Sequence, residues 1–107
     1  MLHRRYVLSE LAIGDRRVTL RHGDVVIAAR AESGDLDWEV LVHTIEPVDV
    51  ARKVHLLTLS CIVGANEDGA LQTETMSGPA FLVRAVEHAL VFRGDGPLDG
   101  IDLTGLF

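Results

Sequence analysis

Alternation of apolar and polar residues between Arg17 and Val42 is the feature that most constrains what this chain can fold into. The alternation is interrupted at Gly23-Asp24 and again at 33–35, where Ser, Gly and Asp are typical turn residues. The uninterrupted segments are 17–22, 25–32 and 36–42. Strict alternation indicates strands with one buried and one solvated face, so the sequence predicts a meander of three antiparallel strands.

The buried face of this meander is predicted by the parity of its apolar residues. It comprises Val18, Leu20, His22, Val25, Ile27, Ala29, Ala31, Leu36, Trp38, Val40 and Val42. Charged residues such as Arg21, Asp37 and Glu39 have the opposite parity and are expected to face solvent.

Further strands are predicted before and after the meander. Residues 6–13 favour a strand, because sequential strands tend to pair. Residues 54–63 form the most apolar segment and predict a central strand, whereas 70–76 predict a polar strand at the surface. A loop closed by Asp68-Gly69 joins the last two. The segment 46–53 contains Pro47 and bunched charges, so we expect it to cross an end of the sheet, with room for one helical turn.

Residues 79–93 are compatible with two structures. Their apolar residues recur at helical spacing, and Gly94 could end a helix. The surrounding strands and the regular spacing of elements favour a hairpin of 79–86 and 88–93. We predict the hairpin, which gives a mainly β fold of about eight short strands, either a small antiparallel barrel or a two-layer sandwich. The alternative is an α+β fold with a C-terminal helix at 79–93.

The length of 107 residues suits a single domain with one hydrophobic core. Residues 94–107 form a glycine-rich tail that nevertheless ends in apolar residues. Because large apolar side chains are uncommon in disordered tails, we expect these residues to pack on the core or on a second subunit. The candidate interface residues are Ile101, Leu103, Leu106 and Phe107.

Charge and cysteine content exclude several classes of function. The net charge of −6 disfavours binding to a phosphate backbone, so no nucleic-acid partner is expected. The single cysteine, Cys61, allows no internal disulfide and no cysteine-based zinc site, which fits a reducing compartment. Without an apolar run long enough to span a membrane or a signal peptide, we predict a cytoplasmic protein with no membrane partner.

Histidines supply the candidate polar site. His22, His55 and His88 fall at predicted strand ends with the parity of the apolar face, so they could gather at one rim. Their separations match no ligand spacing of a metal site, and the sequence therefore predicts neither a metal nor a cofactor. Cys61 lies within an apolar strand, where thiols are usually inert, and no catalytic constellation is recognised.

Two functions are compatible with these features. The first is a non-catalytic binding or assembly module that forms a homo-oligomer or binds another protein. The second is a small closed barrel that binds an apolar or aromatic small molecule, with room for chemistry at a histidine-lined rim. In that case Trp38 would line the pocket, and His22, His55 or His88 would provide its polar groups.

Overall fold

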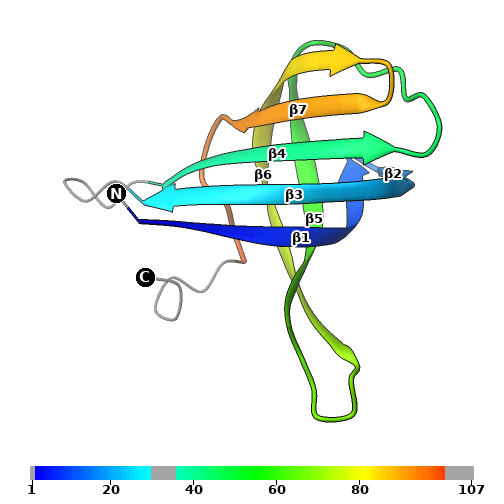
Figure 1. Cartoon of the computed structure of the whole chain (residues 1–107). Helices are drawn as coiled ribbons and strands as arrows, with labels where there is room; N and C mark the ends of the chain where they lie inside the picture. Colours follow the sequence, from blue (N-terminus) through cyan, green and yellow to red (C-terminus); the bar gives the residue numbers. More distant parts are fainter. Residues whose placement is uncertain (1, 30–35, 101–107) are drawn as a thin grey trace.

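Seven antiparallel strands make up the part of the chain that the computed structural model describes, residues 2–29 and 36–100 (Figure 1). They are β1 (Leu2–Ile13), β2 (Arg16–Val18), β3 (Leu20–Ala29), β4 (Leu36–Thr44), β5 (Val54–Ala65), β6 (Leu71–Val86) and β7 (Ala89–Gly94). Within these ranges no residue is helical, and no helix long and apolar enough to cross a membrane is present.

Six of the strands close into a barrel, with the neighbours in the order β1-β3-β4-β7-β6-β5. The first strand closes it because its two halves have different partners: Leu2–Val7 pairs with β3, and Val7–Ile13 pairs with β5. The short β2 lies outside the ring and pairs with the end of β1. The predicted mainly β fold is confirmed, as a barrel and not as a sandwich.

Aliphatic and sulfur-containing side chains and one phenylalanine fill the barrel. The largest fully buried ones are Phe92, Leu11, Ile27, Leu57, Leu59, Met76, Leu82, Leu90, Val25, Val40, Val42 and Cys61. In β4 the burial alternates as the sequence predicts, with Trp38, Val40 and Val42 inside. Because a barrel of so few strands is narrow, its interior is taken up by side chains from all six strands.

One predicted turn is wrong. Gly23-Asp24 does not reverse the chain but lies inside β3, whose residues Gly23 and Asp24 pair with Val42 and Leu41 of β4. A Cβ atom on Gly23 would lie 2.7 Å from Val42 Cγ1, so the glycine serves the close packing of the two strands. The chain instead breaks at Thr19, between β2 and β3. A register shift between Leu20 and His22 also changes the parity, which leaves His22 exposed and not on the buried face.

The predicted hairpin at 79–93 is confirmed, and the alternative helix is wrong. The strand β6 runs without interruption from Leu71 through Gly78-Pro79 to Val86, and β7 returns from Ala89. The segments 70–76 and 79–86 are thus one long strand, which explains why the strand count is seven and not about eight.

The connection between β4 and β5, residues 45–53, crosses an end of the barrel without a helical turn. It is tied down at both ends: Ile45 N–H donates to Thr19 O at 3.1 Å, and Leu82 N–H donates to Lys53 O, also at 3.1 Å. The second bond holds Lys53 beside β6, and the Arg52 side chain lies there as well, because its Nη2 donates to Val83 O.

Candidate functional site

Three of the five histidines lie where β4 ends and β7 begins. His22 and His43 are cross-strand partners on β3 and β4, and their ring centroids are 4.3 Å apart. His88 lies in the turn between β6 and β7. His55 has different neighbours, since its Nε2 is 2.7 Å from Ala51 O and its ring meets Phe92 edge-on at 6.4 Å.

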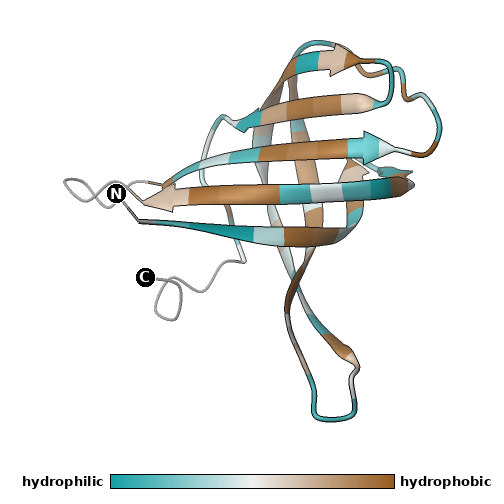
Figure 2. Ribbon diagram, in the orientation of Figure 1, coloured by the Kyte–Doolittle hydropathy of each residue, from teal (hydrophilic) through white to brown (hydrophobic). Residues whose placement is uncertain are grey.

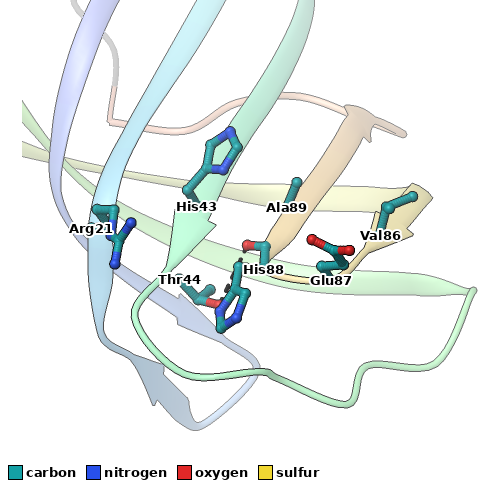
Figure 3. A pocket seen from close by; sticks show the side chains of 7 residues that line it. All are labelled: Arg21, His43, Thr44, Val86, Glu87, His88 and Ala89. Atoms are coloured by element: carbon teal, nitrogen blue, oxygen red, sulfur yellow. Dashed lines mark hydrogen bonds between the residues drawn. The ribbon is translucent and has the colours of Figure 1, made fainter.

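His43 and His88 line an open cavity of about 290 Å³ at this end of the barrel (Figure 3). The other lining residues are Arg21, Thr44, Val86, Glu87 and Ala89. Beneath the cavity Thr44 is buried, and its hydroxyl donates a hydrogen bond to Glu46 O at 2.5 Å. His22, although close to His43, does not line this cavity, and neither does His55.

The cavity is lined by three hydrogen-bonding side chains that can donate, Arg21, His43 and His88, and by one carboxylate, that of Glu87. Arg21 carries a permanent positive charge, and the two imidazoles can donate N–H groups to a carboxylate or phenolic oxygen. Among the described residues, no three histidine, cysteine or acidic side chains are placed to hold a metal ion.

Glu87 is held in an unusual backbone conformation at the edge of the cavity. Its φ is +56°, and among the described residues it is the only one other than glycine with a positive φ. Glu87 and His88 form a two-residue turn between the paired residues Val86 and Ala89. Turns of this length often require positive φ at the first central position, where glycine is the favoured residue.

Trp38 lies in the barrel wall, and only 3% of it is exposed. Its indole N–H donates to Gly96 O at 2.9 Å. Gly94 and Gly78 lie against the ring, so closely that a Cβ atom on Gly94 would be 2.3 Å from Trp38 Nε1. The tryptophan therefore fastens β4 to the segment after β7, and a role for it in a ligand pocket stays a prediction.

Cys61 is fully buried in β5, and its thiol donates to Met76 Sδ at 3.8 Å. Burial raises the pKa of the Cys61 thiol to about 11, with a smaller effect from the nearby carboxylate of Glu74. Because the thiolate is the reactive form, this cysteine is chemically quiet at neutral pH.

A contiguous group of exposed apolar side chains lies on the outside of β5 and β6. We call it the apolar face and define it as Val54, Leu56, Pro79, Phe81 and Val83. Val54 pairs directly with Phe81, and Leu56 pairs with Pro79. Apart from the half-buried proline, the side chains of the face are between 39% and 58% exposed. Contiguous exposed apolar patches are uncommon on monomeric proteins and often mark contact surfaces.

Basic residues lie beside one end of the apolar face, next to Val54, Phe81 and Val83. Arg52 Nη2 donates to Val83 O at 2.7 Å, Lys53 precedes Val54, Arg84 follows Val83, and Arg93 pairs with Phe81 from β7. We call these four residues the basic rim. They are four of the ten lysine and arginine residues in a chain of net charge −6, and the nearest acidic residue in the adjoining strand is Glu39, opposite Arg93.

The other end of the same two strands projects from the barrel as a hairpin tip, residues 63–72 (Figure 1). Within the described part of the chain, β5 beyond Ile62 pairs only with β6, and its partners there are Leu71 and Gln72. The hairpin tip carries Glu67 and Asp68, and no lysine or arginine occurs anywhere between residues 54 and 83. Figure 2 shows its hydrophilic loop in teal.

The sequence reasoning missed the apolar face. The signal that could have identified it is the presence of apolar residues at both parities of the same strand: Val54 and Leu56 beside Leu57, and Phe81 beside Leu82. Strands of this kind are covered on both sides in parallel sheets. In an antiparallel barrel, one of the two apolar sides is left outside.

The predicted tail interface, Ile101, Leu103, Leu106 and Phe107, lies outside the described residues. In the part of the tail that is described, Leu98 is buried and Asp99 forms a β-bridge with Ser77.

Comparison with known proteins yields no relationship from which a function could be transferred. No protein-family model matches the chain, and neither a curated protein nor a solved structure matches it.

Proposed function

We propose that this chain is an assembly module whose copies associate through the apolar face of β5 and β6. The observation that supports the proposal is the direct pairing of apolar residues on the outside of the barrel, Val54 with Phe81 and Leu56 with the half-buried Pro79. Burying such side chains in a subunit contact removes apolar surface from water, which is the main driving force of association. No catalytic step is required for this function.

Sedimentation velocity over a range of protein concentrations tests the proposal. We expect the wild-type protein to form species heavier than the 11.7 kDa monomer, and the double variant Leu56→Ser/Phe81→Ser to sediment as a monomer. A matched control is Val7→Ser/Val26→Ser, because those side chains are exposed to a similar degree (52% and 39%) outside the apolar face. The control should associate as the wild type does. A wild-type protein that stays monomeric at every concentration would refute the proposal.

A second candidate function is the binding of a small aromatic acid in the cavity lined by His43 and His88. The observation that favours it is the joint presence of Arg21 and two imidazoles around a cavity of about 290 Å³, which is close to the lower limit of small-molecule sites. Benzoate is a suitable probe. Its titration should shift the imidazole NMR signals of His43 and His88 but not those of His55, and the shifts should disappear in Arg21→Gln. Unchanged imidazole signals at saturating benzoate would exclude this function.

A further inference from the structure

We infer that the occupant of the apolar face is the hairpin tip of a second copy of this chain, so that the copies associate head to tail. The inference rests on the proposed function, because it names the partner of the same face. It is drawn from the charges and apolar side chains at the two ends of β5 and β6.

A symmetric contact between two apolar faces is disfavoured by the basic rim. In a two-fold contact the same surface of each copy meets itself. Arg52, Lys53, Arg84 and Arg93 of one copy would then lie close to the same four residues of the other. Like charges brought together at an interface oppose association. The apolar face therefore fits a partner surface of opposite charge.

The hairpin tip has the complementary composition. Glu67 and Asp68 give it a negative charge with no basic residue to offset it. It also presents apolar side chains, since Leu71 is 60% exposed and Val63 is 37% exposed. Leu71 and Val63 can contact Leu56 and Phe81 of the next copy, while the carboxylates meet its basic rim.

The geometry of the two surfaces favours a contact between different copies. The apolar face lies where β5 begins and β6 ends, whereas the hairpin tip lies where β5 ends and β6 begins. The two surfaces are thus at opposite ends of one two-stranded ribbon, and the tip projects beyond the barrel (Figure 1). A head-to-tail contact leaves one free face and one free tip on every dimer, so it continues into a ring or an open chain.

Mixing two variants that each lack one surface tests the inference. The face variant is Leu56→Ser/Phe81→Ser, and the tip variant is Glu67→Lys/Leu71→Ser. Asp68 is kept because its Oδ1 accepts the Ala70 N–H at 3.0 Å and so supports the loop. Each variant alone should sediment as a monomer. An equimolar mixture should form a dimer and nothing larger, because only one intact face and one intact tip can meet. The dimer also proves that both variants fold.

The control for the tip variant is Val7→Ser/Glu10→Lys, which makes the same kinds of change at exposed positions of β1. It should assemble as the wild type does. Raising NaCl from about 0.05 M to about 0.5 M should weaken wild-type assembly, because the contact joins opposite charges.

Three results would overturn the inference. If the tip variant assembles like the wild type while the face variant is monomeric, the proposed function stands but the hairpin tip is not the occupant. Loss of assembly in Leu103→Ser/Phe107→Ser, with a tip variant that assembles, would identify the C-terminal segment as the occupant. If the wild type is a monomer, both the inference and the proposed function fail.

Discussion

The indole N–H of Trp38 donates a hydrogen bond to the carbonyl oxygen of Gly96, 58 residues further along the chain. This bond connects β4 to the segment that leaves β7, and it lies next to the bridge between Ser77 and Asp99. The last described residues of the chain are therefore held against the barrel by a side chain of β4, the neighbour of β7, and by the backbone bonds between Ser77 and Asp99.

Replacement of Trp38 by Phe tests the importance of this bond. The variant keeps an aromatic ring but leaves the Gly96 carbonyl without its donor, so we expect the free energy of unfolding to fall by about 1–3 kcal/mol. Hydrogen exchange should localise the effect. The Asp99 amide, which donates to Ser77 O, should lose protection, whereas the Gly69 amide in the distant hairpin loop should not. Equal protection of the Asp99 amide in both proteins would show that the bond is dispensable.

A methyl group at Gly94 should destabilise the protein for a steric reason. Its Cβ atom would lie 2.3 Å from Trp38 Nε1, so Gly94→Ala forces the indole or the backbone to move. We expect a loss of about 1–3 kcal/mol in urea unfolding. The matched control is Gly64→Ala, since a Cβ atom there meets only the flexible end of Gln72, at 3.1 Å. Similar losses in the two variants would contradict this account.

The local alternation of apolar and polar residues was sufficient to predict the mainly β fold, and it predicts the buried parity of Val25, Ile27, Trp38 and Val40. Alternation is a local signal that depends on burial of one strand face. The sequence left two architectures open, a barrel and a two-layer sandwich. Closure into a barrel depends on the pairing of β1 with both β3 and β5. A contact between such distant segments leaves no local trace in a single sequence.

The errors in the predicted strands have the same local origin. Glycine followed by aspartate is typical of a turn, but Gly23 lies within β3. A glycine is needed at this position because Val42 occupies the space where a side chain would be. The exposure of His22 results from the register shift after Leu20, which no residue in the sequence marks. A register shift of this kind exchanges the buried and exposed positions for the residues that follow it in the strand.

Only part of the candidate site could be predicted from the sequence. His88 was expected at a rim, and it lines the end cavity, but its neighbours in that cavity are His43 and Arg21 rather than His22 and His55. The apolar face was missed because it depends on which strands stay uncovered on the outside. That property belongs to the assembled barrel, and periodicity within one strand does not contain it.

Cys61 should make stability depend on pH in the alkaline range. Burial holds its pKa at about 11 in the folded protein, against an ordinary value of 9.0. Between these values the unfolded chain has lost the thiol proton while the folded chain keeps it. The free energy of unfolding should therefore fall as the pH rises from 9.0 to about 11, by about 1.4 kcal/mol per pH unit at most.

Urea unfolding of the wild type and of Cys61→Ala at several pH values measures this contribution. The alanine variant removes the thiol, so its stability should decline less steeply above pH 9 than that of the wild type. Parallel pH profiles for the two proteins would mean that Cys61 ionises as easily in the folded state as in the unfolded state.

Glu87 offers a substitution that should stabilise the protein. With a φ of +56°, it holds a side chain in a region where a Cβ atom is unfavourable. Glu87→Gly removes the Cβ atom, and we expect the free energy of unfolding to rise by about 0.5–1 kcal/mol, with a higher midpoint in thermal unfolding. Glu87→Ala separates backbone strain from the loss of the carboxylate, because alanine removes the charge but keeps the Cβ atom. If the strain is the cause, only the glycine variant gains stability. If both variants gain equally, the carboxylate of Glu87 is the unfavourable group, and the turn itself is unstrained.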